Sequence, residues 1–157
     1  MDEAQVRDLV KGWYYKRAKS ESDLTSKFVF LWFCFNAALA FESDLDRDHE
    51  MLKWLKASDP SDSLLHRAYD KAMGSSSFQN NVEALAKLCP IVSMRYPSKR
   101  ADIQSPDDFP NIVEAIYLVR CNLFHGSKSP SDVRDQKLIK GCAKILEKWV
   151  GNLLHLW

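Results

Sequence analysis

Two side chains near the end of one helical segment could carry acid–base chemistry on a phosphate. Arg120 and His125 are five positions apart in "RCNLFHGS" (120–127), and Gly126 ends the segment. A histidine exchanges protons near neutral pH, so it can take the proton of an RNA 2′-hydroxyl or protonate a leaving oxygen. An arginine can hold a phosphate with paired N–H donors and stabilise the charge that develops on it. The pair would therefore suit phosphodiester cleavage without a metal.

The same two residues could also serve structure alone. Arg120 could pair with a core carboxylate or with carbonyl groups, and His125 could cap the helix end and interact with its dipole. On an ideal wheel, at ~100° per residue, the two side chains lie roughly 140° apart and share no face. If they act together, either the helix end is distorted or the site combines side chains from two copies of the chain. The spacing alone favours the structural roles.

A helix over 110–125 must position both residues. Its apolar residues form one broad arc that comprises Ile112, Val113, Ile116, Tyr117, Val119, Leu123 and Phe124. Arg120 falls inside this arc, where a guanidinium needs a partner when it leaves water. Pro110 suits the first turn because its missing N–H is no loss there, and Gly126 suits a left-handed C-cap.

The remaining periodic segments predict more helices and no strands. The predicted helices cover 3–18, the stretch from "SESD" (20–23) to about residue 43, 46–57, 62–73, 80–89, and the stretch from "SPSD" (129–132) to the C-terminus. The first should turn Val6, Leu9, Val10, Trp13 and Tyr14 inward. The second is apolar on almost every side, so it should be the central element. We expect one domain, residues 1–157, with an all-α, up-and-down helical bundle and additional short helices.

Composition bounds the class of protein. The 157 residues are 46% hydrophobic and 27% charged with a net charge of +1, which is globular and argues against coating nucleic acid by bulk charge. The four cysteines form no C-x-x-C pair, which suggests reduced thiols rather than a zinc or redox site. The beginning of the chain does not resemble a signal peptide, and the apolar run 28–41 is short of the ~20 residues that cross a bilayer. We expect a cytoplasmic protein without a membrane segment.

A basic segment lies in the long irregular stretch 91–109. "SMRYPSKR" (93–100) places Arg95, Lys99 and Arg100 beside Tyr96. Cations next to an aromatic ring could contact a nucleic-acid backbone and stack a base. A solvated basic loop remains the alternative interpretation of this segment.

Two stretches carry a resemblance to a known family. "VRCNLFHG" resembles the signature of the HEPN superfamily, in which Arg, four to six residues and then His lie near the end of a helix. "SKFVFLWFCFNAALAF" (26–41) is similar to the aromatic-rich helix with an internal Phe-Asn that many stand-alone HEPN proteins carry early in the chain. The resemblance covers 20–43 and 108–157 well, and the middle only loosely.

The resemblance implies a concrete function. Active HEPN domains are all-α, metal-independent endoribonucleases that cut single-stranded RNA and need no cofactor. They dimerise so that two such motifs line one cleft, and they serve as toxins with a protein antitoxin, in antiviral defence and in RNA processing. Arg120 and His125 would be the matching catalytic residues, and cleavage would leave a 2′,3′-cyclic phosphate.

Three neighbouring or upstream residues would support this pair. The residue after the arginine is commonly polar in active members, and here it is Cys121. Asn122 could supply the missing hydrogen bond. Asn36, on the nearly all-apolar helix, could orient Arg120 or His125, or satisfy a backbone group in the core.

The sequence also allows functions other than a nuclease. A non-catalytic HEPN module that binds RNA, a nucleotide or a protein partner is the alternative. Asp44, Asp46 and Asp48 fit the first positions of a calcium loop, but His49 and Leu55 stand where that loop needs glycine and glutamate. We therefore expect no metal site.

Overall fold

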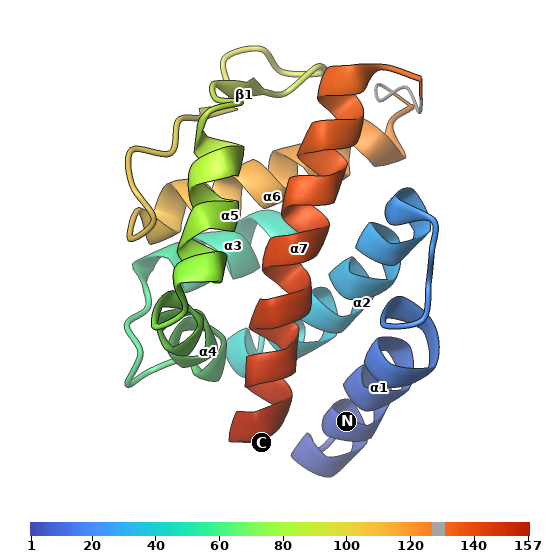
Figure 1. Cartoon of the computed structure of the whole chain (residues 1–157). Coiled ribbons are helices and arrows are strands. Elements are labelled where there is room, and N and C mark those ends of the chain that lie inside the picture. Colours follow the sequence, from blue (N-terminus) through green and yellow to red (C-terminus); the bar gives the residue numbers. More distant parts are fainter. Residues whose placement is uncertain (127–130) are drawn as a thin grey trace.

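The computed structural model describes residues 1–126 and 131–157, and this part of the chain is all-α apart from one short strand pair (Figure 1). The prediction of an all-α fold is confirmed. The elements are α1 (Glu3–Trp13), the π-helical turn η1 (Tyr14–Ala18), α2 (Leu24–Ser43), α3 (Asp48–Ala57), α4 (Leu64–Met73), α5 (Ser76–Ala86), β1 (Ile91–Val92), β2 (Arg100–Ala101), α6 (Phe109–Phe124) and α7 (Val133–Leu156).

Short polar side chains begin most of these helices. The N-cap residues whose side chains accept a backbone N–H of the first turn are Asp2, Asp23, Ser63, Ser75 and Asp132. Such acceptors satisfy backbone donors that have no partner inside the helix. Caps of this kind explain why the helices begin where they do.

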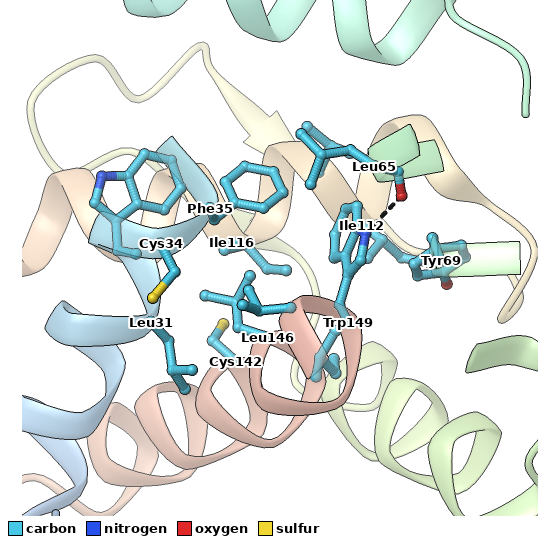
Figure 2. Packing of buried hydrophobic residues seen from close by; sticks show 14 of the residues in the cluster. Leu31, Cys34, Phe35, Leu65, Tyr69, Ile112, Ile116, Cys142, Leu146 and Trp149 are labelled. Carbon is cyan, nitrogen blue, oxygen red and sulfur yellow. Dashed lines mark hydrogen bonds between the residues drawn. The ribbon is translucent and has the colours of Figure 1, made fainter. Parts of the chain in front are cut away.

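The core lies between α2, α4, α6 and α7, and Trp149 of α7 is at its centre. Figure 2 shows the Trp149 ring between Phe35, Tyr69 and the start of α4, where its Nε1–H donates to the Leu65 carbonyl oxygen at 2.7 Å. The ring centroids of Phe35 and Tyr69 lie 5.0 and 5.1 Å from that of Trp149, both in edge-to-face geometry. Trp149 has no exposed surface, so a hydrogen bond and aromatic packing together fix α4 against α7.

The helix α2 is long and apolar enough to cross a membrane by length and composition alone, with a mean hydropathy of 1.5 over its most apolar window. Core helices of soluble proteins pass the same test. Here α2 packs against α1, α3 and α7, and its buried residues include Phe28, Leu31 and Leu39. The prediction that 28–41 is helical is confirmed, but its burial is only partial, since Phe33 on the same helix is 37% exposed.

Several details differ from the predictions. Leu9 of α1 is 38% exposed, while Val6, Val10 and Tyr14 point inward as expected. The helix predicted at 80–89 is α5, and it begins earlier because Ser75 caps it. Residues 91–101 form a small antiparallel hairpin, which the sequence pattern did not indicate because each strand has only two residues. The "SPSD" start predicted for the last helix falls partly outside the described residues, and α7 begins at Val133 after Asp132.

Candidate nucleotide-binding site

The end of α6 presents His125 to solvent. His125 is the C-cap residue, and its backbone N–H donates to the Cys121 carbonyl oxygen at 3.0 Å. Gly126 follows with a φ of +71°, a left-handed conformation that favours glycine and ends the helix. The predicted position of both residues is therefore confirmed, and the imidazole is exposed at the helix terminus.

Arg120 lies on a different side of α6 from His125, and its side chain contacts α2 and α3. Its guanidinium carbon is 4.6 Å from the centroid of the Phe124 ring, 5.5 Å from that of Trp32 and 5.9 Å from that of Tyr117. Its Nη1 lies 3.5 Å from a carboxylate oxygen of Asp48 and 3.8 Å from the Sγ of Cys121. The three rings and the carboxylate hold the cation in one place, because a guanidinium is attracted to ring faces and to opposite charge.

This environment leaves the Arg120 side chain only 22% exposed, and its Nε has no hydrogen-bond partner within the described residues. A phosphate that binds the guanidinium from solvent would have to compete with Asp48. The structural interpretation, in which Arg120 pairs with a carboxylate, agrees with this arrangement. The carboxylate of Asp48 is itself partly exposed, so the ion pair is accessible from solvent.

The hairpin presents the basic segment next to α6. Ile91 pairs with Ala101 and Val92 with Arg100, and the loop 93–99 joins the two strands. The loop is ordered by its own hydrogen bonds: Ser93 donates its N–H to the Lys99 carbonyl at 2.9 Å, and Tyr96 donates its N–H to the Ser93 hydroxyl at 3.0 Å. Figure 1 shows β1 at the top of the view, at the same end of the molecule as the start of α7.

Asn122 joins the hairpin to α6. Its side-chain oxygen accepts the N–H of Met94 at 2.9 Å, and its amide nitrogen donates to the carbonyl oxygen of Val92 at 3.0 Å. The Asn122 residue is 3% exposed. We predicted that Asn122 supplies a hydrogen bond beside Arg120; in the structure both ends of its amide instead bond the hairpin backbone.

The hairpin and the end of α6 enclose a pocket of about 230 Å³. Its lining includes Arg95, Tyr96 and Lys99 from the hairpin, and Cys121 and His125 from α6. The structure thus brings three of the four predicted RNA-contacting residues to the predicted histidine. Arg120 is not among the lining residues.

Cations also flank the ring of Tyr96. The guanidinium carbon of Arg95 lies 5.3 Å, and the Nζ of Lys99 5.1 Å, from the ring centroid. The Tyr96 residue is 51% exposed. An exposed ring with two adjacent cations can stack a base while the cations contact the neighbouring phosphates.

Tyr117 and Cys121 form the wall between this pocket and Arg120. Both line the pocket, and both contact the guanidinium. Burial, and then a side-chain hydrogen bond with Cys121, raise the pKa of the Tyr117 hydroxyl above its ordinary range. Tyr117 therefore stays protonated and can donate a hydrogen bond. Its place beside Arg120 could have been expected, since residues three apart share a helix face, whereas the Asp48 contact from α3 carries no local signal.

The remaining predicted site residues lie elsewhere. Arg100 pairs loosely with Asp102 at 3.7 Å and lines a second cavity, described below. Asn36 is half-buried on α2, and within residues 1–126 and 131–157 no hydrogen bond joins it to Arg120 or His125. Across the same residues no group of three His, Cys, Asp or Glu side chains could hold a metal ion.

Comparisons of the chain with protein-family models, with curated proteins and with solved structures found no match.

Proposed function

We propose that the protein is a metal-independent endoribonuclease that cuts single-stranded RNA in the cytoplasm, with His125 as the proton-transfer group. The observation that carries the proposal is the shared pocket: an exposed histidine, two cations and an exposed aromatic ring line one cavity of about 230 Å³. This set suits a nucleotide with its phosphate. The resemblance of "VRCNLFHG" to the HEPN signature supports the same reading.

The chemistry needs only side chains and RNA. The neutral imidazole of His125 takes the proton of the 2′-hydroxyl, and the 2′-oxygen attacks the phosphorus. The bond from phosphorus to the 5′-oxygen breaks, and that oxygen is protonated by an acid. One product ends in a 2′,3′-cyclic phosphate and the other in a 5′-hydroxyl. Arg95 and Lys99 hold the phosphate and offset the charge that develops on it.

A homodimer would complete this site. Two motifs in one cleft would supply a second His125 as the acid, and Arg120 would stabilise the phosphate from beside the pocket wall. The exposed ring of Phe124, next to Arg120, is available for a contact between copies. A role as a toxin held by a protein antitoxin, or as an antiviral component, belongs to the same proposal.

Cleavage of RNA in EDTA tests the proposal. Wild type and the variants His125→Ala, Arg120→Ala and Arg120→Lys are incubated with structured and unstructured RNAs, and the ends are checked for cyclic phosphate. His155→Ala is the matched control, because His155 is also an exposed histidine near a helix end but lines none of the described pockets. We expect His125→Ala to lower the rate by about 10²-fold or more, and His155→Ala to leave it unchanged.

The result that would overturn the nuclease is intact RNA with folded wild-type protein. Equal activity of wild type and His125→Ala would also remove His125 from the mechanism. Sedimentation of wild type at micromolar concentration tests the dimer independently.

A second candidate function, RNA binding without cleavage, is favoured by one observation. The guanidinium of Arg120 is already occupied by Asp48 at 3.5 Å and by three aromatic rings. If Arg120 serves only packing, the pocket would bind a nucleotide without the second catalytic group. RNA that binds wild type tightly yet stays uncut would support this candidate.

A further inference from the structure

A second cavity lies beside the pocket, between α3, α6 and the hairpin. Its volume is about 610 Å³. We call it the α3 groove and define it by six of its lining residues: His49, Lys53, Lys56, Lys99, Arg100 and Glu114. Four of these are permanent or near-permanent cations and one is an acid, so the groove is strongly positive although the whole chain carries a net charge of only +1.

The single acid of the α3 groove is already paired. Lys56 donates to a carboxylate oxygen of Glu114 at 2.5 Å, which leaves the charges of the other cations unbalanced. Arg100 approaches Asp102 only at 3.7 Å, and both side chains are more than half exposed. In the described part of the chain, Lys53 has no carboxylate within ion-pair distance. The groove therefore offers free positive charge to an anion.

The α3 groove is continuous with the pocket that holds His125. Lys99 and Tyr117 line both cavities. An RNA strand with one nucleotide in the pocket can therefore continue past Lys99 and Tyr117 into the groove. A ligand with regularly spaced phosphates fits such a row of cations that leads away from an aromatic pocket.

We propose that the α3 groove binds the phosphates of the RNA strand on one side of the nucleotide held in the pocket. This inference rests on the proposed function for the choice of RNA, but it concerns binding and not cleavage. The groove would make recognition depend on RNA length: a dinucleotide fills only the pocket, whereas a longer strand reaches Lys53 and Arg100. An acidic peptide is the competing ligand.

Binding of RNA that cannot be cleaved measures the contribution of the groove to affinity separately from catalysis. We would use 2′-O-methyl RNA, either a dinucleotide or a single strand of about ten nucleotides, which is within the usual site size for such proteins. The groove variant is Lys53→Gln/Arg100→Gln. Both residues are exposed, and neither is placed in the catalytic pocket.

The control variant is Lys140→Gln/Lys144→Gln. These lysines are also exposed and also line a lysine-rich cavity, but that cavity lies between α5 and α7. Both variants change the net charge by the same amount, so a difference between them cannot come from bulk charge. Thermal unfolding of both variants establishes that they fold.

For the longer strand, we expect loss of two phosphate contacts to lower the slope of log K against log salt by about 1.4. Between about 50 and 200 mM salt, that slope corresponds to a roughly sevenfold smaller loss of affinity in the groove variant than in wild type. The dinucleotide should bind wild type and the groove variant equally, and the control variant should behave as wild type with both ligands.

Three results would overturn the inference: an unchanged slope in the groove variant, an equal change in the control variant, or competition by a polyglutamate peptide as strong as that by RNA. The two proposals fail separately. If wild type cuts no RNA but shows the groove-dependent slope, the nuclease fails and the groove stands. If the groove variant cuts and binds long RNA as wild type does, the groove fails and the nuclease stands.

Discussion

Replacement of Asn122 should weaken the attachment of the hairpin to α6 without disturbing the rest of the core. The variant Asn122→Ala removes the hydrogen bonds from Met94 N–H, at 2.9 Å, and to the Val92 carbonyl oxygen, at 3.0 Å. Each is worth about 1 kcal/mol net, so the loss is about 2 kcal/mol. For a chain of this length, that loss lowers the melting temperature by about 4–8 °C.

Digestion with trypsin can report the opening of the hairpin separately from global unfolding. Trypsin cuts after Arg95, Lys99 and Arg100, and cutting within the hairpin requires that it open first. If opening is easier by about 2 kcal/mol, the cleavage rate under native conditions rises about 30-fold. Mass spectrometry of the first fragments identifies the cut sites.

Asn152→Ala is the matched control. Asn152 is also a buried asparagine, 6% exposed, and its amide donates to the Ala68 carbonyl oxygen at 3.3 Å, between α7 and α4. We expect this variant to lose stability but to keep the wild-type rate of cutting in the hairpin. A rate for Asn122→Ala within about twofold of wild type would refute the reasoning, because the amide would then contribute almost nothing to docking.

Three further predictions concern the scaffold. Trp149→Phe removes the hydrogen bond to Leu65 and leaves a void, so denaturant unfolding followed by circular dichroism should show a loss of about 2–3 kcal/mol. Gly151→Ala places a methyl group 2.8 Å from the Tyr14 hydroxyl and should destabilise by about 1–3 kcal/mol; in a Tyr14→Phe background the same change should be neutral or stabilising, and equal effects in both backgrounds would contradict the clash. Burial raises the pKa of Glu42 above its ordinary 4.5, so wild type should lose stability relative to Glu42→Gln as pH rises from about 4 to about 7, and a pH-independent difference in urea unfolding would contradict this sign.

Local signals were sufficient for most of the helices. The stretch "SESD" (20–23) predicts the start of the second helix, and in the structure Asp23 caps it through the N–H of Ser26. Pro110 and Gly126 were expected at the two ends of the helix that carries the motif, and they lie there. Caps, prolines and left-handed glycines act within one turn of the helix, so the sequence alone reveals them.

The site was harder to predict because its contacts come from distant segments. The wheel placed Arg120 and His125 on different sides of α6, and the structure agrees. The wheel could not show that Asp48, from α3, would meet Arg120. Nor could it show that Asn122 would bring residues 92–94 against the helix, because that pairing joins positions about thirty apart in the chain.

The way the hairpin is held has a consequence for how this protein could diversify. The hydrogen bonds of Asn122 and those between the two strands all involve backbone atoms of the hairpin. They therefore do not depend on which side chains the loop between the strands carries. The side chains of residues 94–99 are exposed. Substitutions there should be tolerated by folding, and they would alter the charge and shape offered to a ligand. The hairpin is therefore a segment that can be randomised, or grafted from another sequence, to select new binding preferences on an unchanged helical frame.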